Sequence, residues 1–563
     1  MMLEFFTEIS KYVNVLLMIV FAISGLYAVL NKKITRRAFG DFCAYQRVVI
    51  ILFNLQSGAL IFFHELGGGR TLEFVRMFGI AWIALIVLNF TMSKMHRGTN
   101  KILTNSITFL LSIGIVMLWR LRPDNCIRQI WWIVVSVVAI NVVMYILRCR
   151  WVYKIPWWLW AGGALVLAVL PFIFPSPENG SLNWVYIHGI TFQPSELIKP
   201  ILVFLLSSLY IRKHKISSIL IGGGIVGALA LILLVQNDLG MILIFCSMFL
   251  LMTYDYTQRE WILIGGVVGV LVCGVAAYFF VGHVKTRVDI WLDPWTDIDD
   301  GGYQIAQSLF AIVGGKFLGT GLYQGMPYYI PEGWTDMIFA AICEEFGSIF
   351  GALMVAIYLL MALLMFNLVS RYENRLRRNI AMACSIITGI QTILIIGGVI
   401  KMIPLTGVTL PFVSYGGTSM LSMFVIMGIV QELFRSRSQT ERKVSMRRRE
   451  DRKKPGERPL PARSDSMSPG TEDIPKIYTS RYKKSEKVLK GCFIVLYIVL
   501  AIWILKTIVL DSMMIGTNAY NPRLSVLESR YIRGSILDQD GQYMAQQVQN
   551  EDGSYSRVYP YGS

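Results

Sequence analysis

The sequence has little charge. Only 16% of its 563 residues are charged and 55% are hydrophobic, whereas about a quarter of the residues in soluble domains are charged. This composition excludes an ordinary soluble protein. The eight cysteines form no C-x-x-C pair and the five histidines are dispersed, which argues against both a disulfide framework and a structural zinc site.

The chain consists largely of long apolar runs. A run of about 20 such residues spans a bilayer as a helix, and a helix satisfies its own backbone hydrogen bonds in lipid. The runs are continuous rather than alternating, so a β-barrel is disfavoured. The sequence therefore predicts an all-α polytopic membrane protein with about fourteen transmembrane helices. The predicted spans are 13–30, 47–63, 75–92, 102–119, 130–148, 157–174, 196–212, 217–234, 240–254, 260–281, 338–369, 377–402, 410–434 and 491–510.

Basic residues set the orientation of these spans. If the N-terminus lies outside the cytoplasm, the Lys- and Arg-rich loops fall on the cytoplasmic side, with the basic loop 120–128 as the exception. The net charge of +17 is concentrated in residues 435–490, which carry 18 basic and 8 acidic residues. We interpret this segment as facing anionic lipid rather than nucleic acid. The loop 282–336 and the chain after Asp511 are then predicted to lie outside the cytoplasm.

The composition changes near the C-terminus. Residues 436–487 are rich in Arg, Lys, Ser, Pro and Glu, which predicts a basic flexible cytoplasmic linker. A single transmembrane anchor, 488–511, comes after it. Residues 512–563 return to a mixed composition with strand-like stretches such as 529–538, and they predict a short extracytoplasmic tail of α/β or β-rich structure. We expect this tail to be incomplete, because it is too short to stand as a domain.

Ionisable residues at the rim of membrane helices are costly and point to function. Glu196 and Lys199 are spaced i, i+3 and share one helix face, as either a structural ion pair at a helix start or part of a ligand site. Asp238 stands just before an apolar run. Capping of the following helix is its stronger interpretation, and catalysis is the alternative.

The loop 287–321 carries four aspartates whose oxygens are suitable ligands for a divalent cation. Their order matches no calcium-binding loop, so a solvated loop is the simpler interpretation for most of them. Arg287 and Lys316 bracket the loop and suit a pyrophosphate, Arg287 through its planar fork of donors. The four aspartates are Asp293, Asp297, Asp299 and Asp300.

Asp336 stands where a polar loop meets the apolar run that begins at Met337. From the local sequence alone, an N-cap of the following helix is a stronger interpretation for this carboxylate than a general base. Thr335 is an equally good cap for the same helix, which leaves Asp336 partly redundant in that role.

Several separate motifs, taken in order, resemble the signature of the SEDS family (shape, elongation, division and sporulation proteins of the RodA and FtsW kind). They are Trp184 ahead of FQPSELIK, then QNDLG, RVDIWLDPWTD with GGYQIAQSLFAI, PEGWTDMIFAAICEEFG and PFVSYGGTS. The resemblance covers roughly 102–435 and implies a ten-helix SEDS glycosyltransferase core. Residues 1–101 then form an additional three-helix membrane region. The sequence departs from the family at Asn237, where members usually have proline.

The resemblance implies polymerisation of peptidoglycan glycan strands from lipid II, a disaccharide-pentapeptide carried on undecaprenyl pyrophosphate. It assigns the essential carboxylate to Asp336, as the general base on the acceptor sugar's 4-hydroxyl. Lys199 and Arg287 become candidates for stabilising the leaving pyrophosphate, a task that a divalent cation such as Mg or Mn can share. The active site is expected on the extracytoplasmic side of the bacterial plasma membrane. The predicted substrate-binding residues are Trp184, Gln193, Glu196, Lys199, Asp238, Arg287, Lys316 and Ser414.

The tail has a resemblance of its own. Residues 521–546, NPRLSVLESRYIRGSILDQDGQYMAQ, resemble the membrane-proximal start of a class B penicillin-binding protein. Such proteins crosslink peptides with an SxxK serine, an SxN and a KTG, and this sequence contains no KTG. The resemblance implies a polymerase fused to the anchor of a transpeptidase and truncated before the transpeptidase domain. The fusion would place that partner in cis.

Two other functions are open to the same residues. A lipid II transporter (flippase) would place essential charges along a path between both membrane faces, whereas the candidate charges gather towards the outer side. A non-catalytic scaffold for a transpeptidase would have no need of the intact motif around Asp336.

Overall fold

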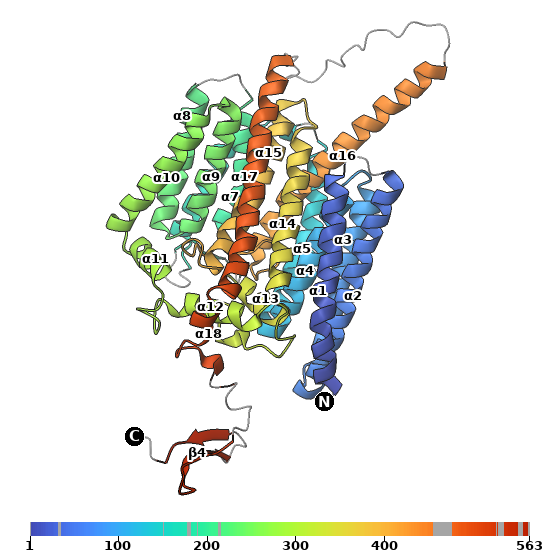
Figure 1. Cartoon of the computed structure of the whole chain (residues 1–563). Helices are drawn as coiled ribbons and strands as arrows, with labels where there is room; N and C mark the ends of the chain where they lie inside the picture. The colour runs from blue at the N-terminus through green and yellow to red at the C-terminus, as the bar shows by residue number, and fades with distance from the viewer. Residues whose placement is uncertain are drawn as a thin grey trace.

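The protein is a bundle of long helices with a small sheet at its C-terminal end (Figure 1). The computed structural model describes residues 2–31, 35–149, 151–176, 182–187, 190–211, 216–453, 476–524, 526, 534–549 and 555–560. The α-helices are α1 Met2–Leu30, α2 Arg36–Gly68, α3 Thr71–Phe90, α4 Lys101–Leu121, α5 Pro123–Ile146, α6 Trp157–Ile173, α7 Pro194–Leu209, α8 Ile216–Val235, α9 Leu239–Thr257, α10 Glu260–Phe280, α11 Gly282–Leu292, α12 Tyr303–Gly315, α13 Ile338–Phe346, α14 Ser348–Val369, α15 Arg375–Val399, α16 Gly417–Lys453, α17 Lys476–Val509 and α18 Ser512–Gly516.

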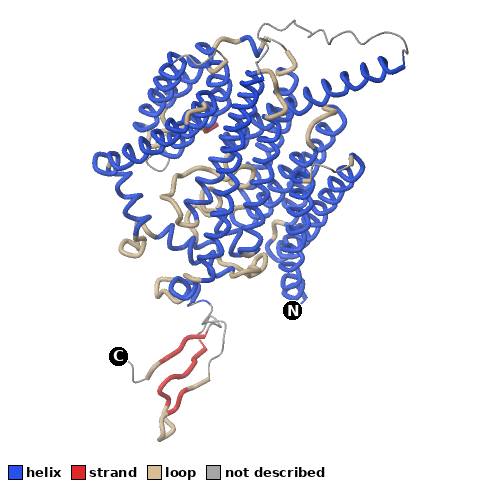
Figure 2. The backbone as a smooth tube through the Cα atoms, turned by 45° about the horizontal axis from the view of Figure 1, so that its top comes forward, coloured by secondary structure: helices blue, strands red, loops and turns tan. Residues whose placement is uncertain are grey.

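Two small antiparallel sheets accompany the helices. Strands β1 (Val185–Ile187) and β2 (Ile190–Phe192) pair just before α7. Strands β3 (Ile536–Leu537), β4 (Tyr543–Gln549) and β5 (Tyr555–Val558) form a three-stranded sheet in the order β3-β4-β5. Figure 2 shows this second sheet beyond the end of the helical bundle.

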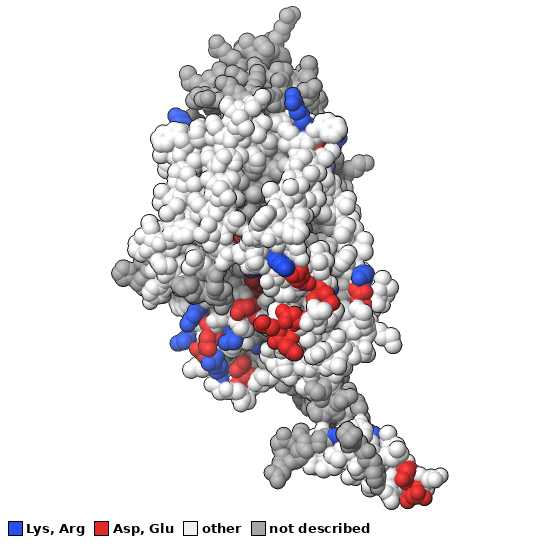
Figure 3. Space-filling model, turned by 90° about the vertical axis from the view of Figure 1, so that its left-hand side faces the viewer, with Lys and Arg blue, Asp and Glu red and all other residues white. Residues whose placement is uncertain are grey.

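Twelve of the described helices are long and apolar enough to cross a membrane. The polytopic helical prediction is therefore confirmed, but the predicted count of fourteen is not reached. The two predicted spans that fall short are α6 and α7, with 17 and 16 residues. A helix of 16 residues is about 24 Å long, less than the roughly 30 Å of a hydrocarbon core. In Figure 3 a broad face almost free of charge lies above an end where charged side chains gather.

The predicted single span 338–369 is wrong, because the chain breaks at Gly347 into α13 and α14. Gly347 has φ +91°, and a Cβ there would come within 2.5 Å of the backbone of Leu318 and Gly319. Only glycine tolerates both the left-handed backbone and this close approach. The nine-residue α13 is completely buried, so the segment that begins just after Asp336 ends inside the bundle.

The segment predicted to be a flexible linker is helical wherever the structure describes it. Helix α16 begins at Gly417, later than the predicted 410, and continues to Lys453, while α17 already begins at Lys476. Residues 454–475 lie outside the described part of the chain. Arg, Lys, Gln and Glu are good helix formers, and the i, i+4 pair of Arg437 and Glu441 at 3.0 Å supports the extension. The amino-acid composition of the segment did not predict this helix.

The additional N-terminal helices and the C-terminal anchor pack directly on the core. Helix α1 packs against α2 and α14, α2 also contacts α4, and α3 contacts α5. On the other side of α14, α17 packs along it and also touches α15 and α9 (Figure 1).

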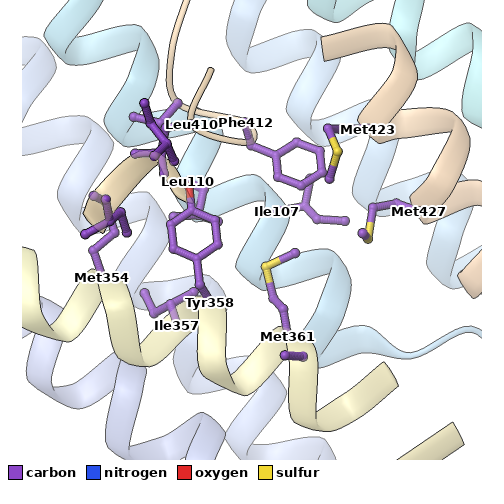
Figure 4. Packing of buried hydrophobic residues seen from close by; sticks show 14 of the residues in the cluster. Ile107, Leu110, Met354, Ile357, Tyr358, Met361, Leu410, Phe412, Met423 and Met427 are labelled. Carbon is purple, nitrogen blue, oxygen red and sulfur yellow. The ribbon is translucent and has the colours of Figure 1, made fainter. Parts of the chain in front are cut away.

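The loop between α15 and α16 is supported from below by apolar packing. Figure 4 shows Tyr358 of α14 among Leu110, Met354 and Leu410, and its hydroxyl donates to the carbonyl oxygen of Pro411 at 2.6 Å. This irregular loop, 404–416, therefore rests on the buried core and forms one wall around Asp336.

Candidate active site

Asp336 lies in the turn before α13, where three segments meet. Gly407 of the 404–416 loop marks the meeting point: a Cβ built on it would lie 3.5 Å from Asp336 Oδ2 and 3.9 Å from Arg287 Nη1. Arg287 comes from α11 and donates from Nη1 to the carbonyl oxygen of Leu405 at 3.2 Å. The carboxylate and the guanidinium thus face the same small glycine, which leaves space beside both.

Burial raises the pKa of Asp336 to about 7. The negative charges of Glu332 and Asp238 add to this rise, and the positive charge of Arg287 opposes it. A carboxyl group with a pKa near the working pH is suited to accept and release a proton. The electrostatic environment therefore favours acid–base chemistry at this residue.

The capping role predicted for Asp336 from local sequence is wrong. The N-cap residue of α13 is Met337, and no side chain caps this end. Thr335 does not cap it either, since its hydroxyl donates to Glu332 Oε2 at 2.8 Å. Among the described residues, no group donates a hydrogen bond to the Asp336 carboxylate. The carboxylate is thus left available to a ligand.

Ser414 supports this turn. Its hydroxyl donates to the carbonyl oxygen of Thr335 at 2.6 Å and accepts from the backbone N–H of Leu410 at 2.9 Å. Gln129 of α5 holds the same loop by donating to the Ser414 carbonyl oxygen at 3.2 Å. Ser414 is buried and its hydroxyl is used within the protein, so the structure places it as a support for Asp336 and not at the open side of the site.

Asp238 is a hub of hydrogen bonds. Its Oδ2 accepts from Asn183, Gln193 and Ser195, each at 2.9 Å. Its Oδ1 accepts from the backbone N–H of Met241 at 3.3 Å and so caps α9, which confirms the capping interpretation. Gln193, a predicted substrate-binding residue, uses its side-chain amide N–H to donate to Asp238.

Two neighbours of the hub complete this part of the site. Trp184 comes directly after Asn183 and is half-buried, with its carbonyl oxygen accepting from the backbone N–H of Ser176 at 3.1 Å. Asn237 has φ +61°, a conformation closed to proline. Proline, which members of the family usually have here, would therefore not fit the backbone that this chain adopts.

Glu196 and Lys199 form the ion pair that their spacing predicted, and both are buried on α7. Lys199 Nζ also donates to Gln391 Oε1 at 2.8 Å, and Gln391 Nε2 donates to the carbonyl oxygen of Thr409 at 3.0 Å. This chain of contacts ties α7 to the 404–416 loop. Because Lys199 is fully enclosed, Arg287 is the better placed of the two predicted cations to act beside Asp336.

Lys316, the other predicted partner of a pyrophosphate, does not line the same space as Arg287. It is exposed and lines a cavity of about 470 Å³ whose lining includes neither Asp336 nor Arg287. The four aspartates of the neighbouring loop are exposed, as expected of a solvated loop. Within the described ranges, no three His, Cys, Asp or Glu side chains are placed to hold a metal ion together. The divalent cation stays a prediction, since Mg²⁺ is often held by one or two carboxylates together with substrate phosphates, and no reaction step is assigned to one.

The sequence interpretation missed two arginines near the site. Arg122 lies over the ring of Trp334, 4.2 Å from its centroid, and Arg120 pairs with the buried Glu345 at 2.9 Å. Both belong to the basic loop 120–128, the one loop whose charge contradicted the predicted orientation. That exception to the Lys and Arg bias of the loops was the available signal.

The fold and site together define a polytopic helical membrane protein with a half-buried carboxylate beside an arginine. A sequence model of the FtsW, RodA and SpoVE family, described as "Cell cycle protein", matches residues 101–439, and the chain belongs to this family. It is 28% identical over 434 residues to the peptidoglycan glycosyltransferase RodA of Mycobacterium bovis, covering 72% of this chain and 90% of the relative. It is 34% identical over 278 residues to a probable peptidoglycan glycosyltransferase FtsW of Wigglesworthia glossinidia brevipalpis, covering 47% and 72%.

The fold of the core also resembles a solved structure. A chain from "Structural coordination of polymerization and crosslinking by a peptidoglycan synthase complex" superposes with a TM-score of 0.52 at 22% identity. The superposition covers 61% of this chain and 99% of the other. At this identity the likeness supports the fold alone.

Proposed function

We propose that this chain is a peptidoglycan glycosyltransferase that polymerises lipid II into glycan strands and releases undecaprenyl pyrophosphate. The observation that carries the proposal is the carboxylate of Asp336, which accepts no hydrogen bond from the described residues, lies beside Arg287, and has its pKa raised by burial to about 7. The chain belongs to a family whose similar members include peptidoglycan glycosyltransferases. A non-catalytic scaffold would not require such a carboxylate, whereas a transporter could use one as a proton relay, so the test has to separate transport from polymerisation.

The proposed reaction uses Asp336 as general base. The carboxylate takes the proton from the acceptor sugar's 4-hydroxyl as that oxygen attacks the anomeric carbon of the donor. The bond from the anomeric carbon to the pyrophosphate oxygen breaks, and undecaprenyl pyrophosphate leaves with the electron pair. The guanidinium of Arg287 lies beside the same glycine as Asp336 and is suited to stabilise the charge that develops on the leaving group.

Two further parts of the sequence interpretation belong to this proposal, the side of the membrane and the C-terminal anchor. We place the active site on the extracytoplasmic side, since the basic loops define the cytoplasmic side. We also propose that α17 is the anchor of a class B penicillin-binding protein and that the β3-β4-β5 sheet belongs to the start of its extracytoplasmic part. The packing of α17 along α14 supports a partner held in cis.

The test is a gel assay for glycan strands made by the purified chain from labelled lipid II. Wild type is compared with Asp336→Asn and with Asp299→Asn, which changes an exposed aspartate of the outer loop. We expect polymer from wild type and from Asp299→Asn, and none from a folded Asp336→Asn. Polymer from both aspartate variants would remove Asp336 from the chemistry. Polymer from none of the three proteins would contradict the polymerase and favour transport or scaffolding.

A further inference from the structure

Two successive glutamates of α13 each hold an arginine from a distant part of the chain. Glu345 pairs with Arg120 of α4 at 2.9 Å. Glu344 pairs with Arg523, which lies in the short segment after α17 and α18. Both glutamates are buried. Arg523 lies outside residues 101–439, the range matched by the family model, so this contact is an addition to the family core.

Each of the three nitrogens of the Arg523 guanidinium donates at least one hydrogen bond. Its Nε and Nη2 donate to the two carboxylate oxygens of Glu344 at 2.8 and 2.9 Å. Its Nη1 donates to Gln307 Oε1 of α12 at 2.9 Å, and Nη2 also reaches the carbonyl oxygen of Met326 at 3.3 Å. The residue is 4% exposed. A bidentate, buried pair of this kind fixes geometry as well as charge.

The contact acts on the frame of the proposed active site. Glu344 Oε1 also accepts from the backbone N–H of Met326, and the Glu344 carbonyl oxygen accepts from Thr320. Arg523 thereby joins α12, the 320–326 loop and α13 into one unit. Helix α13 begins two residues after Asp336, so a tilt or shift of this short helix moves the carboxylate.

We propose that Arg523 is a positioning residue that locks α13, and with it Asp336, in the geometry for glycosyl transfer. This inference rests on the proposed polymerase function. The segment after the anchor is then a working part of the polymerase and not only a connection to the C-terminal sheet. Lysine would be a poor substitute, because it offers a single point of charge where arginine offers a planar fork.

The surroundings of Arg523 indicate that its loss acts locally. The cavity of about 470 Å³ borders both Arg523 and Glu344, so water can reach the carboxylate when the guanidinium is removed. The anchor itself is held elsewhere, since Ser485 of α17 donates to Asp255 Oδ1 at 2.7 Å. We therefore expect Arg523→Ala to fold with α17 in place and with α13 loosened.

The kinetic test compares full-length Arg523→Ala and Arg523→Lys with a matched control, Arg378→Ala. Arg378 forms a buried bidentate pair with Asp255 at 2.6 and 2.8 Å, so its loss removes the same chemistry from α15. We expect Arg523→Ala to lower kcat at least about tenfold, with KM for lipid II within about threefold. Arg523→Lys should recover only part of the rate. After correction for the folded fraction, Arg378→Ala should keep kcat within about threefold of wild type.

A second measurement is independent of activity. Cys343 precedes Glu344 on α13 and is fully buried, as is Cys384 on α15. In a background where the other cysteines are replaced, a maleimide should label Cys343 faster in Arg523→Ala than in wild type, with labelling of Cys384 unchanged. This labelling still tests the lock if wild type makes no polymer and the proposed function fails.

Either of two outcomes would overturn the inference. The first is a kcat for Arg523→Ala that matches that of Arg378→Ala. The second is labelling of Cys343 that does not change, or that rises only together with Cys384, because a general loss of stability exposes both thiols.

Discussion

The hydroxyl of Ser414 donates a hydrogen bond to the carbonyl oxygen of Thr335 at 2.6 Å. Through this bond the loop between α15 and α16 holds the residue that precedes Asp336. The two segments are far apart in sequence, and each carries one of the motifs that the family resemblance brought together. The geometry shows why both motifs occur in one site: one supplies the carboxylate and the other fixes its backbone.

Ser414→Ala should weaken this support. The substitution leaves the Thr335 carbonyl oxygen and the Leu410 N–H without their partner, which costs about 1–3 kcal/mol for a buried group. We expect a loss of polymerisation rate that exceeds the loss of stability, measured by glycan-strand formation and by thermal unfolding. The matched control is Ser385→Ala, which removes only a bond within α15 to the Ala381 carbonyl oxygen. Equal effects of both substitutions on the rate would contradict a supporting role for Ser414.

The rate of polymerisation should depend on pH through Asp336. The base must be unprotonated, so with a pKa of about 7 the rate should rise as the pH increases through neutrality and then level off. Arg287 opposes the rise in this pKa, so Arg287→Gln should move the rise of the profile to higher pH. The measurement is kcat as a function of pH for both proteins. A wild-type profile that is flat from about pH 5 to about pH 8 would rule out this assignment.

The stability of the folded protein should fall as the pH rises, whereas the rate of polymerisation should increase. The pKa of Asp336 is raised in the folded protein, so folding favours the protonated carboxyl group. This contribution is fully present below the ordinary pKa of an aspartate and is lost as the pH rises through about 7. Asp336→Asn removes the effect, so we expect it to gain stability relative to wild type between about pH 5 and about pH 8. Thermal unfolding at both values tests this, and a variant that is less stable than wild type at the higher pH would argue for a structural role.

Asp238→Asn should lower the stability of the protein, whereas Asp336→Asn should raise it. Its carboxylate accepts hydrogen bonds from Asn183, Gln193 and Ser195 on one oxygen, and an asparagine would turn a donor towards part of this set. Bonds to a charged group are worth about 1.5–3 kcal/mol each, so we expect a loss of stability of about 3 kcal/mol. Thermal unfolding distinguishes this hub from Asp336. A fully stable Asp238→Asn would show that the hub is unimportant for folding.

The Glu196–Lys199 pair offers a test of structure against ligand binding. Removing one partner leaves an uncompensated buried charge and costs about 3–5 kcal/mol, whereas replacing both with apolar residues is often close to neutral. We therefore expect Lys199→Met alone to be unstable and the double variant Glu196→Leu with Lys199→Met to fold nearly as well as wild type. If the double variant folds but has lost binding of lipid II, the pair contributes to the ligand site.

The sequence by itself determined the class of the molecule and the identity of its central carboxylate. The free energy of moving a helix into lipid is roughly the sum of the contributions of its own residues. It can therefore be read from a run of apolar residues without knowing which other helices pack against it. The helices were therefore predictable, as was the i, i+3 pair of Glu196 and Lys199, which depends only on helix geometry. Asp336 could be named because its motif survives intact, although its local sequence favoured a cap.

The tertiary structure decided which polar groups are engaged within the protein. Ser414, Gln193 and Lys199 all looked available in the sequence, but each is engaged by a partner from another helix or loop. The break at Gly347 depends on the backbone of Leu318 and Gly319 passing within contact distance. Such pairings join segments up to hundreds of residues apart, and their energies depend on three-dimensional distance and burial, so no local pattern encodes them. Tertiary packing supplies Asp238 with donors such as Asn183, and among the described residues it supplies none to the carboxylate of Asp336.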